Sequence, residues 1–227
     1  MMTRQEHDEV LKTIRDARLV AILRGVPQEK LSGVVEALIA GGVRVLELTF
    51  DHAKENCVED NIEKIRFVSE NFGDRVIVGC GTALNAEEVE AAYRAGASLV
   101  VSPDCNEDVI KKTRELSMVS MPGALTPTEI VKAYRAGADI VKIFPAGELG
   151  MGFITALQGP LGFIPMSAVG GVKPETVEDF LNAGICGFGV GGQLVLSAAV
   201  KSGDFGAIEK RAREFTDAIA RWEEKNQ

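Results

Sequence analysis

The chain has 227 residues, of which 46% are hydrophobic and 6% aromatic, and this is enough apolar material for one sizeable core. A formal net charge of −8, without a basic stripe among the aromatic residues, argues against a nucleic-acid partner. Residues 1–10 lack the apolar core of a secretory leader and no apolar run is long enough to cross a bilayer, so we expect no membrane association.

The cysteines and histidines bear on the cellular location of the protein and on metal binding. The four cysteines are scattered without a Cys-x-x-Cys pair, which predicts reduced thiols and a cytoplasmic location. The two histidines, His7 and His52, are not spaced as a ligand pair, and no Asp/Glu cluster has recognisable metal spacing, so we expect no metal site. The cysteines are Cys57, Cys80, Cys105 and Cys186.

Helical and strand patterns alternate along the chain. Helices are predicted at 3–17, 31–40, 54–71, 85–95, 106–116, 127–136, 151–158, 174–183 and after 190, and strands at 19–24, 43–50, 75–80, 98–101, 118–121, 138–146, 163–169 and 185–190. Eight strands alternating with helices favour parallel pairing, and we predict an α/β fold, a closed (β/α)₈ TIM barrel with an additional N-terminal helix. No linker and no GxGxxG fingerprint interrupts the pattern, so we expect a single domain over residues 1–227.

A short repeat supports equivalent βα units. The segment 92–97, AYRAGA, recurs letter for letter at 133–138, and related Ala-Gly pairs occur at 40–41 and 183–184. Each glycine stands where a predicted helix ends and a strand begins, which is the place of a helix C′ residue.

One buried strand carries a lysine. In the stretch 138–146, Lys142 shares one strand face with Ile140 and Phe144, which leaves it no polar face. Burial lowers the pKa of an unpaired ammonium, and a neutral amine is a nucleophile that forms Schiff bases with carbonyl compounds. A lysine that reaches solvent, or that closes a structural ion pair, is the alternative.

A second apolar strand, 43–50, carries Glu47 where a hydrophobic residue is expected. Buried opposite charges in separate strands need each other or a substrate. Glu47 and Lys142 are far apart in sequence, so only a closed or wound sheet brings them together. We favour a catalytic acid/base beside an amine nucleophile over a lone salt bridge.

The remaining candidate residues follow the predicted strands, where a barrel has its functional face. Two glycine pairs close the seventh and eighth strands, a place where barrels hold phosphate against backbone N–H groups; tight structural turns are the alternative. Arg24 and Thr82 could bind a substrate carboxylate, and Arg24 could equally be a surface loop residue. The two pairs are Gly170 with Gly171 and Gly191 with Gly192.

Seven stretches carry a resemblance to a known family: VAILRG at 20–25, GGVRVLELTF at 41–50, GCGTAL at 79–84, VSPD at 101–104, MPGALTPTE at 121–129, VKIFPA at 141–146 and GGV at 170–172. The chain resembles the class I aldolases of the 2-keto-3-deoxy-6-phosphogluconate (KDPG) and 4-hydroxy-2-oxoglutarate group over nearly its whole length. The resemblance implies that Lys142 is the Schiff-base lysine and Glu47 the general acid/base. It further implies substrate contacts from Arg24 and Thr82, pocket walls from Pro103 and Phe144, and a phosphate site at Gly170, Gly171, Gly191 and Gly192.

We therefore expect a lyase that cleaves KDPG, and also 4-hydroxy-2-oxoglutarate, to pyruvate and an aldehyde, either glyceraldehyde 3-phosphate or glyoxylate. It would need no cofactor, take a keto-acid phosphate as its small-molecule partner, and form the homotrimer that the resemblance implies. Two alternatives remain from other classes. A barrel isomerase or epimerase would use Lys142 only for its charge, and a phosphosugar sensor would hold Lys142 and Glu47 as a structural pair.

The chain also departs from the pattern of KDPG aldolases. Asp51 stands where they carry an arginine, Ala168-Val169 replaces a Pro-Thr pair, and Gly192 replaces a serine. VAILRG and AVGGV look more like the related 2-keto-3-deoxy-6-phosphogalactonate (KDPGal) aldolases, so that activity is a further alternative.

Overall fold

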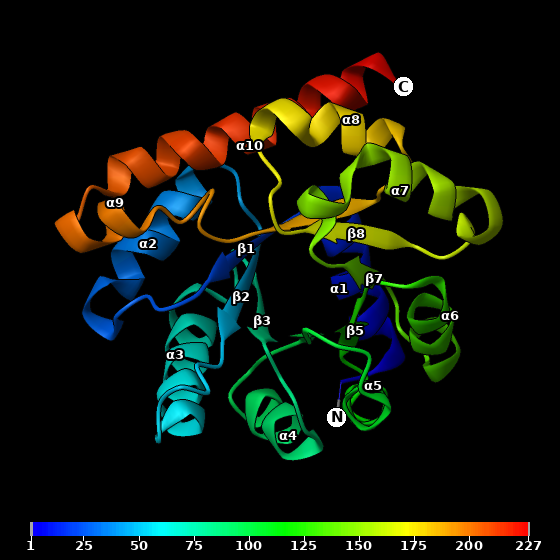
Figure 1. The fold of residues 1–227 in the computed structure, drawn as a ribbon. Coiled ribbons are helices and arrows are strands. Elements are labelled where there is room, and N and C mark those ends of the chain that lie inside the picture. Colours follow the sequence, from blue (N-terminus) through cyan, green and yellow to red (C-terminus); the bar gives the residue numbers. More distant parts are fainter. Residues whose placement is uncertain (1, 227) are drawn as a thin grey trace.

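The computed structural model describes residues 2–226 as a nearly closed barrel of parallel strands inside a ring of helices (Figure 1). The strands are β1 (Leu19–Leu23), β2 (Val45–Thr49), β3 (Ile77–Gly81), β4 (Leu99–Val101), β5 (Val119–Met121), β6 (Gly123–Ala124), β7 (Val141–Ile143), β8 (Met166–Val169) and β9 (Gly187–Val190). The helices are α1 (Arg4–Ala17), α2 (Gln28–Ala40), α3 (Cys57–Phe72), α4 (Ala86–Arg94), α5 (Glu107–Glu115), α6 (Pro127–Ala136), α7 (Ala146–Leu161), the short 3₁₀ turn η1 (Pro174–Thr176), α8 (Val177–Asn182), α9 (Ser197–Ser202) and α10 (Phe205–Lys225). The order β5-β4-β3-β2-β1-β9-β8-β7-β6 and the α1 helix confirm the predicted fold.

The two edges of this sheet are consecutive in the chain. Only Pro122 separates β5, which pairs with β4, from β6, which pairs with β7. Two half-strands therefore share one strand position, and this is why nine strands are found where eight were predicted. The proline explains the break, because it has no N–H to donate to a neighbouring strand. Its carbonyl still accepts the backbone N–H of Lys142 at 2.9 Å.

Alternate strand residues face two different apolar regions. Val141 and Ile143 of β7 pack in a large cluster that includes the outer helices, whereas Ile140 belongs to a smaller cluster inside the barrel. Successive side chains of a strand point to opposite faces, so Lys142 shares the inner face with Ile140. The same alternation along β2 turns Glu47 into the barrel.

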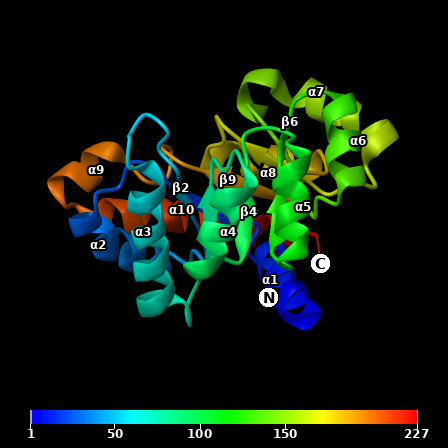
Figure 2. The same cartoon turned by 90° about the horizontal axis from the view of Figure 1, so that it is seen from below.

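Helix α1 closes the end of the barrel at which the strands begin. It contacts β1, β3 and β5, and its Ile14 is buried in the inner cluster. Figure 2 shows α1 below the strands. A capping box formed by Thr3 and Glu6 fixes where the helix starts. The other end of the barrel, where the strands finish, is left for a site.

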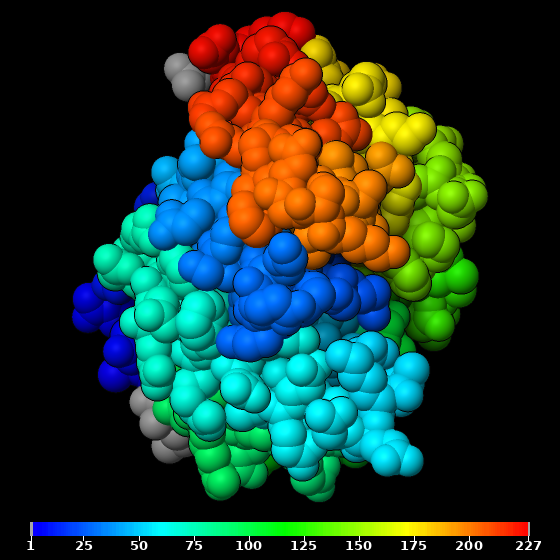
Figure 3. All heavy atoms as spheres, turned by 90° about the vertical axis from the view of Figure 1, so that its left-hand side faces the viewer, coloured from blue at the N-terminus to red at the C-terminus, as the bar shows by residue number. Residues whose placement is uncertain are grey.

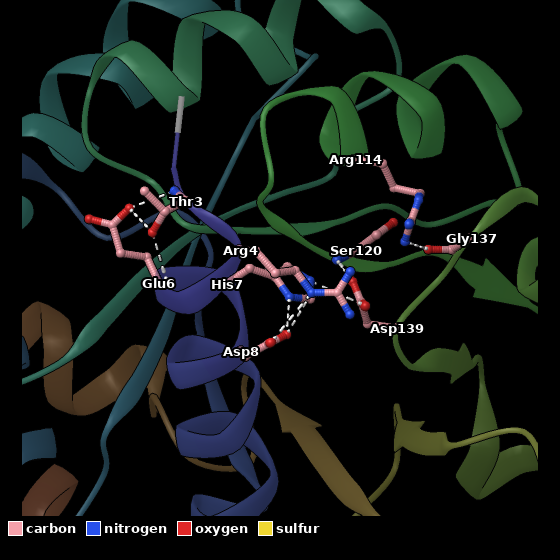
Figure 4. A network of polar contacts seen from close by, with 9 residues as sticks. All are labelled: Thr3, Arg4, Glu6, His7, Asp8, Arg114, Ser120, Gly137 and Asp139. Atoms are coloured by element: carbon pink, nitrogen blue, oxygen red, sulfur yellow. Dashed lines mark hydrogen bonds and ion pairs between the residues drawn. The ribbon is translucent and has the colours of Figure 1, made fainter.

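Polar contacts fasten α1 to the segment that leads into β7 (Figure 4). The His7 ring lies between two carboxylates, with Nδ1 at 3.1 Å from Asp8 Oδ1 and Nε2 at 3.3 Å from Asp139 Oδ1. The other oxygen of Asp139 accepts the backbone N–H of Ser120 at 2.8 Å. Ser120 is buried, so the carboxylate satisfies a donor that water does not reach.

We expect Asp139→Ala to lower the free energy of unfolding by about 1–3 kcal/mol, because it leaves the buried N–H of Ser120 without its acceptor. Urea unfolding measures this loss. The matched control is Asp16→Ala. It removes an exposed carboxylate of α1 that pairs with Lys12 of that helix, and it should lower the free energy of unfolding by less than about 0.5 kcal/mol. Equal losses in both variants would contradict the proposed role of the Asp139 contact.

Glycines mark four passages from helix to strand, and all four have left-handed backbones. The φ angles are +92° at Gly42, +101° at Gly96, +107° at Gly137 and +90° at Gly184. Glycine adopts this conformation without strain and so ends a helix cleanly. The βα units predicted to be equivalent from the AYRAGA repeat therefore share a backbone conformation at the end of the helix. In the first unit the residue with the left-handed backbone is Gly42 and not Gly41.

Helix α10 completes the ring by packing on α2, and Figure 3 shows its orange and red surface lying directly against the blue surface of α2. A Cβ atom at Gly41 would lie 2.3 Å from the Cβ of Ala212, so a glycine is required for this close approach. Thr216 Oγ1 donates to the Gly41 carbonyl at 2.9 Å. Beneath these helices the first strand, β1, pairs with the last, β9, as barrel closure requires.

Several predicted elements have different bounds, and the strand expected at 138–146 is reduced to β7, Val141–Ile143. The helix expected at 54–71 starts at Cys57, after turns, and the strand expected at 163–169 starts at Met166, with Phe163 67% exposed. The short helix expected at 151–158 belongs to α7, which begins at Ala146 and contains a non-helical Gly150 with φ 75° and ψ 164°. Several glycines in α7 weaken its helical pattern, which is why the sequence underestimates its length.

Candidate active site

A cavity of about 390 Å³ opens where the strands end. All ten residues singled out in the sequence line it, together with six that were not predicted. The predicted residues are Arg24, Glu47, Thr82, Pro103, Lys142, Phe144, Gly170, Gly171, Gly191 and Gly192. The additional residues are Ile22, Val169, Val172, Gly189, Val190 and Gln193.

Lys142 and Glu47 enter the cavity from different strands, and both are buried. Lys142 is 7% exposed and Glu47 3% exposed. The amine of Lys142 lies 5.2 Å from the ring centre of Phe144, a cation–π distance. Glu47 Oε1 accepts the Thr49 hydroxyl at 3.3 Å. A Cβ atom at Gly81 would lie 1.8 Å from Glu47 Oε1, so only glycine at this position leaves room for the carboxyl group.

Burial shifts both groups toward their neutral forms. It raises the pKa of the Glu47 carboxyl, and the charges of Lys142 and Arg24 and the Thr49 hydrogen bond oppose this in part. It lowers the pKa of the Lys142 amine; the Glu47 carboxylate opposes that shift, and the Arg24 guanidinium adds to it. The cavity therefore holds an amine that loses its proton readily beside a carboxyl group that keeps one readily.

These charges predict opposite effects of two substitutions on Lys142. Glu47→Gln removes a negative charge that raises the pKa of Lys142, so the pKa should fall. Arg24→Gln removes a positive charge that lowers it, so the pKa should rise. Only the neutral amine reacts with cyanate, and mass spectrometry of carbamylated Lys142 across pH gives its midpoint. Shifts in the same direction, or none, would contradict the electrostatic account, and Arg4→Gln at the far end of the barrel is the control.

Arg24 and Thr82 come together at the mouth. Arg24 follows β1 and Thr82 follows β3, and the Arg24 guanidinium donates to Thr82 Oγ1 at 3.2 Å. Both side chains line the cavity that holds Lys142. A guanidinium beside a hydroxyl is suited to a carboxylate.

The loops after β8 and β9, here called the glycine loops, form another part of the wall. Gly170 and Gly171 have φ angles of +88° and +75°, which favour glycine. The Gly170 carbonyl accepts the Gly147 N–H at 2.8 Å, which ties the first loop to the start of α7. Within residues 2–226 we find no acceptor for the backbone N–H groups of Gly171, Gly192 and Gln193. Such donors at a cavity wall are suited to an anion.

Sequence reasoning missed two polar residues of the barrel. Ser167 pairs in register with Lys142, is 1% exposed and has no hydrogen-bond partner among the described residues. Ser167 lies two residues before Val169 on β8, so both share one strand face, and this was the available signal that Ser167 faces into the barrel. Gln193 follows the second glycine pair directly, and only the cavity shows that it lines the wall.

In residues 2–226 no group of three or more His, Cys, Asp or Glu side chains is arranged to hold a metal ion. No helix in this range combines the length and the apolar character needed to span a membrane.

Comparisons with known proteins agree with this geometry. The family model described as "KDPG and KHG aldolase" matches residues 10–211. The chain is 34% identical over 177 residues to the 2-dehydro-3-deoxy-6-phosphogalactonate aldolase of Escherichia coli (strain K12), covering 78% of this chain and 83% of that protein. It is 35% identical over 185 residues to the 2-dehydro-3-deoxy-phosphogluconate aldolase of Dickeya dadantii (strain 3937), covering 80% and 82%.

A solved structure agrees with the sequence comparisons. The one described as "Native KDPGal structure" matches with a TM-score of 0.81 and 32% identity, covering 91% of this chain and 96% of that chain. The family model spans most of the chain, and the relatives cover more than three quarters of it. The resemblance seen in the sequence is thereby confirmed: the chain belongs to the KDPG and KHG aldolase family, and like its relatives it is a lyase.

Proposed function

We propose that one aldolase domain extends over residues 1–227 and cleaves a 2-keto-3-deoxy-6-phospho sugar acid to pyruvate and glyceraldehyde 3-phosphate through a Schiff base on Lys142. The observation that carries the proposal is the buried Lys142 amine in one cavity with the buried Glu47 carboxyl group. Burial lowers the pKa of the amine, and a neutral amine attacks a ketone.

The proposed reaction uses these two groups in turn. The Lys142 amine adds to the C2 ketone, and Glu47 donates the proton with which the carbinolamine hydroxyl leaves as water. The protonated imine then accepts the electron pair of the C3–C4 bond while Glu47, through a water, takes the proton of the C4 hydroxyl. The aldehyde departs, the enamine is protonated at C3, and hydrolysis of the imine releases pyruvate. A carboxyl group whose pKa is raised can both give and take protons near neutral pH.

Two polar parts of the cavity wall would bind the two charged ends of the substrate. Arg24 and Thr82, which share a hydrogen bond, would bind the carboxylate beside C2. The glycine loops would bind the phosphate through N–H groups that have no acceptor within residues 2–226. Pro103 and Phe144 would pack against the carbon chain between them.

A substrate panel tests this function. The pyruvate released from KDPG, KDPGal and 4-hydroxy-2-oxoglutarate is measured with lactate dehydrogenase, and kcat/KM is compared among the three. KDPGal is the second candidate, because the Escherichia coli relative is a phosphogalactonate aldolase and Asp51 replaces the arginine of KDPG aldolases. Release of pyruvate from none of the three would overturn the proposal.

The phosphate site has its own prediction. In Gly192→Asp the new side chain has room, because a Cβ atom there meets nothing within 4 Å, yet it brings negative charge to the cavity wall. We expect kcat/KM for the phosphorylated sugar acid to fall steeply, since repulsion removes binding that orients the ketone. Cleavage of 4-hydroxy-2-oxoglutarate, which has no phosphate, should change much less.

The control for this prediction carries the same charge elsewhere. Gly159→Asp lies on α7 outside the cavity and also meets nothing within 4 Å, so both substrates should be cleaved at normal rates. Circular dichroism checks that both variants are folded. Equal losses on the two substrates in Gly192→Asp would mean that the loop is a structural turn.

Assembly and location complete the proposal. We propose a homotrimer, as the resemblance implies. Phe163 and Tyr134 are 67% and 41% exposed and pack edge to face, and such an aromatic pair is suited to burial in an assembly. Light scattering gives the state in solution. We also propose a cytoplasmic location, which the four free cysteines support because the cytoplasm is reducing. Cell fractionation tests this location.

A further inference from the structure

Thr82, which lines the cavity, has a conformation that its residue type disfavours. Its φ angle is +57°, in the left-handed region. A β-branched residue rarely occupies this region, because its side chain crowds the backbone. Other contacts must therefore hold Thr82 in place.

His52 supplies one such contact. Its Nε2 lies 2.8 Å from the carbonyl oxygen of Thr82. A carbonyl oxygen only accepts hydrogen bonds, so Nε2 carries the proton and donates it. His52 stands in the loop after β2, three residues beyond Thr49, and its ring lies against that of Phe50 with centroids 6.1 Å apart.

A buried carboxylate supports the loop, and a thiol meets the ring. Oε2 of Glu88 in α4 accepts the backbone N–H of Leu84 at 2.7 Å, and Cys57 Sγ lies 3.8 Å from His52 Nδ1, the ring nitrogen that accepts when Nε2 carries the proton. Asn106, the N-cap of α5, donates to the Leu84 carbonyl at 3.0 Å. The segment 82–84 is thus held on one side by His52 and on the other by Glu88 and Asn106.

The conformation of Thr82 decides where its hydroxyl lies. That hydroxyl accepts a hydrogen bond from Arg24, whose guanidinium lines the same cavity. We propose that His52 is a positioning residue: by holding the Thr82 carbonyl it keeps the Thr82 hydroxyl and the Arg24 guanidinium aimed at the substrate carboxylate. The inference rests on the proposed function and adds to it a residue that does not line the cavity.

Matched variants separate the hydrogen bond from the packing. His52→Phe keeps a ring against Phe50 but has no donor, whereas His52→Gln keeps an N–H donor that reaches about as far as Nε2. We expect His52→Phe to raise KM by about tenfold with kcat little changed, the effect of losing one positioned hydrogen bond, and His52→Gln to restore most of it. His7→Gln, at the opposite end of the barrel, is the control and should match the wild type.

A double-mutant cycle tests the route through Thr82. Glycine adopts positive φ freely and has no hydroxyl, so in a Thr82→Gly background His52 has nothing left to position. His52→Phe should therefore have no further effect on KM in that background. An equal rise in KM in both backgrounds, or no rescue by glutamine, would overturn the proposal. If circular dichroism shows that His52→Phe is unfolded, His52→Ala takes its place in the cycle.

Trapping separates this proposal from the proposed function. With pyruvate and borohydride, His52→Phe should still form an adduct on Lys142 at saturating pyruvate, but should need about tenfold more pyruvate for half-maximal trapping. Absence of an adduct in the wild type would reject the Schiff-base function itself. An adduct that forms with the same pyruvate dependence in both proteins would reject only the role of His52.

Discussion

Pyruvate and sodium borohydride are expected to inactivate the wild-type protein and to leave one reduced adduct, on Lys142. The physical reason is the burial of Lys142, which is 7% exposed and whose pKa is lowered by desolvation, so that it attacks a ketone as a neutral amine. Peptide mass spectrometry locates the adduct. Lys142→Arg keeps a positive charge but offers no such nucleophile, and it should show neither adduct nor cleavage.

Two controls sharpen the trapping result. Lys173→Met removes an exposed lysine that follows the first glycine loop and should leave the Lys142 adduct unchanged. Borohydride without pyruvate should leave activity intact, because there is no imine to reduce. An adduct on another lysine, or cleavage by Lys142→Arg at a normal rate, would remove the covalent mechanism.

The second large effect concerns Glu47. We expect Glu47→Gln to keep the fold and to slow kcat by about 10²- to 10⁴-fold, the usual cost of losing a positioned general acid/base. Glutamine has nearly the same shape and fits beside Gly81, so the packing of the cavity is preserved. Steady-state cleavage gives kcat, and borohydride trapping of pyruvate reports how much imine formation survives.

A neighbouring residue provides the control for Glu47. Thr49→Val removes the hydroxyl that donates to Glu47 Oε1 but leaves the carboxyl group, so it should slow turnover far less than Glu47→Gln. A near-normal kcat in Glu47→Gln would reduce Glu47 to a structural partner of Lys142.

Strand periodicity predicted the centre of the site well. An alternation of period two places Lys142 and Glu47 on inward faces whatever the loops do, and the barrel then brings the two strands to one cavity. The glycine pairs were predictable for a similar reason, because they follow strands β8 and β9 directly. The roles of these residues in the reaction remain predictions.

Loop contacts were beyond the sequence. The hydrogen bond between His52 and Thr82 depends on a positive φ angle at Thr82, which no residue pattern predicts. The split of one strand at Pro122 also depends on tertiary pairing. The proline alone does not determine that β5 pairs with β4 and β6 with β7. Periodicity predicts directions of side chains along an element, whereas such contacts depend on how elements meet.

The closure of the barrel by α1 has a kinetic consequence. With one end closed, both products must leave through the mouth through which the substrate entered. In the proposed reaction pyruvate stays bonded to Lys142 after the C3–C4 bond breaks, whereas the aldehyde half is free to leave. We therefore expect ordered release, with the aldehyde first and pyruvate last. Pyruvate should then inhibit competitively against the sugar acid, because both would bind the free enzyme, and the aldehyde should inhibit noncompetitively, because it would bind the enzyme that still carries pyruvate.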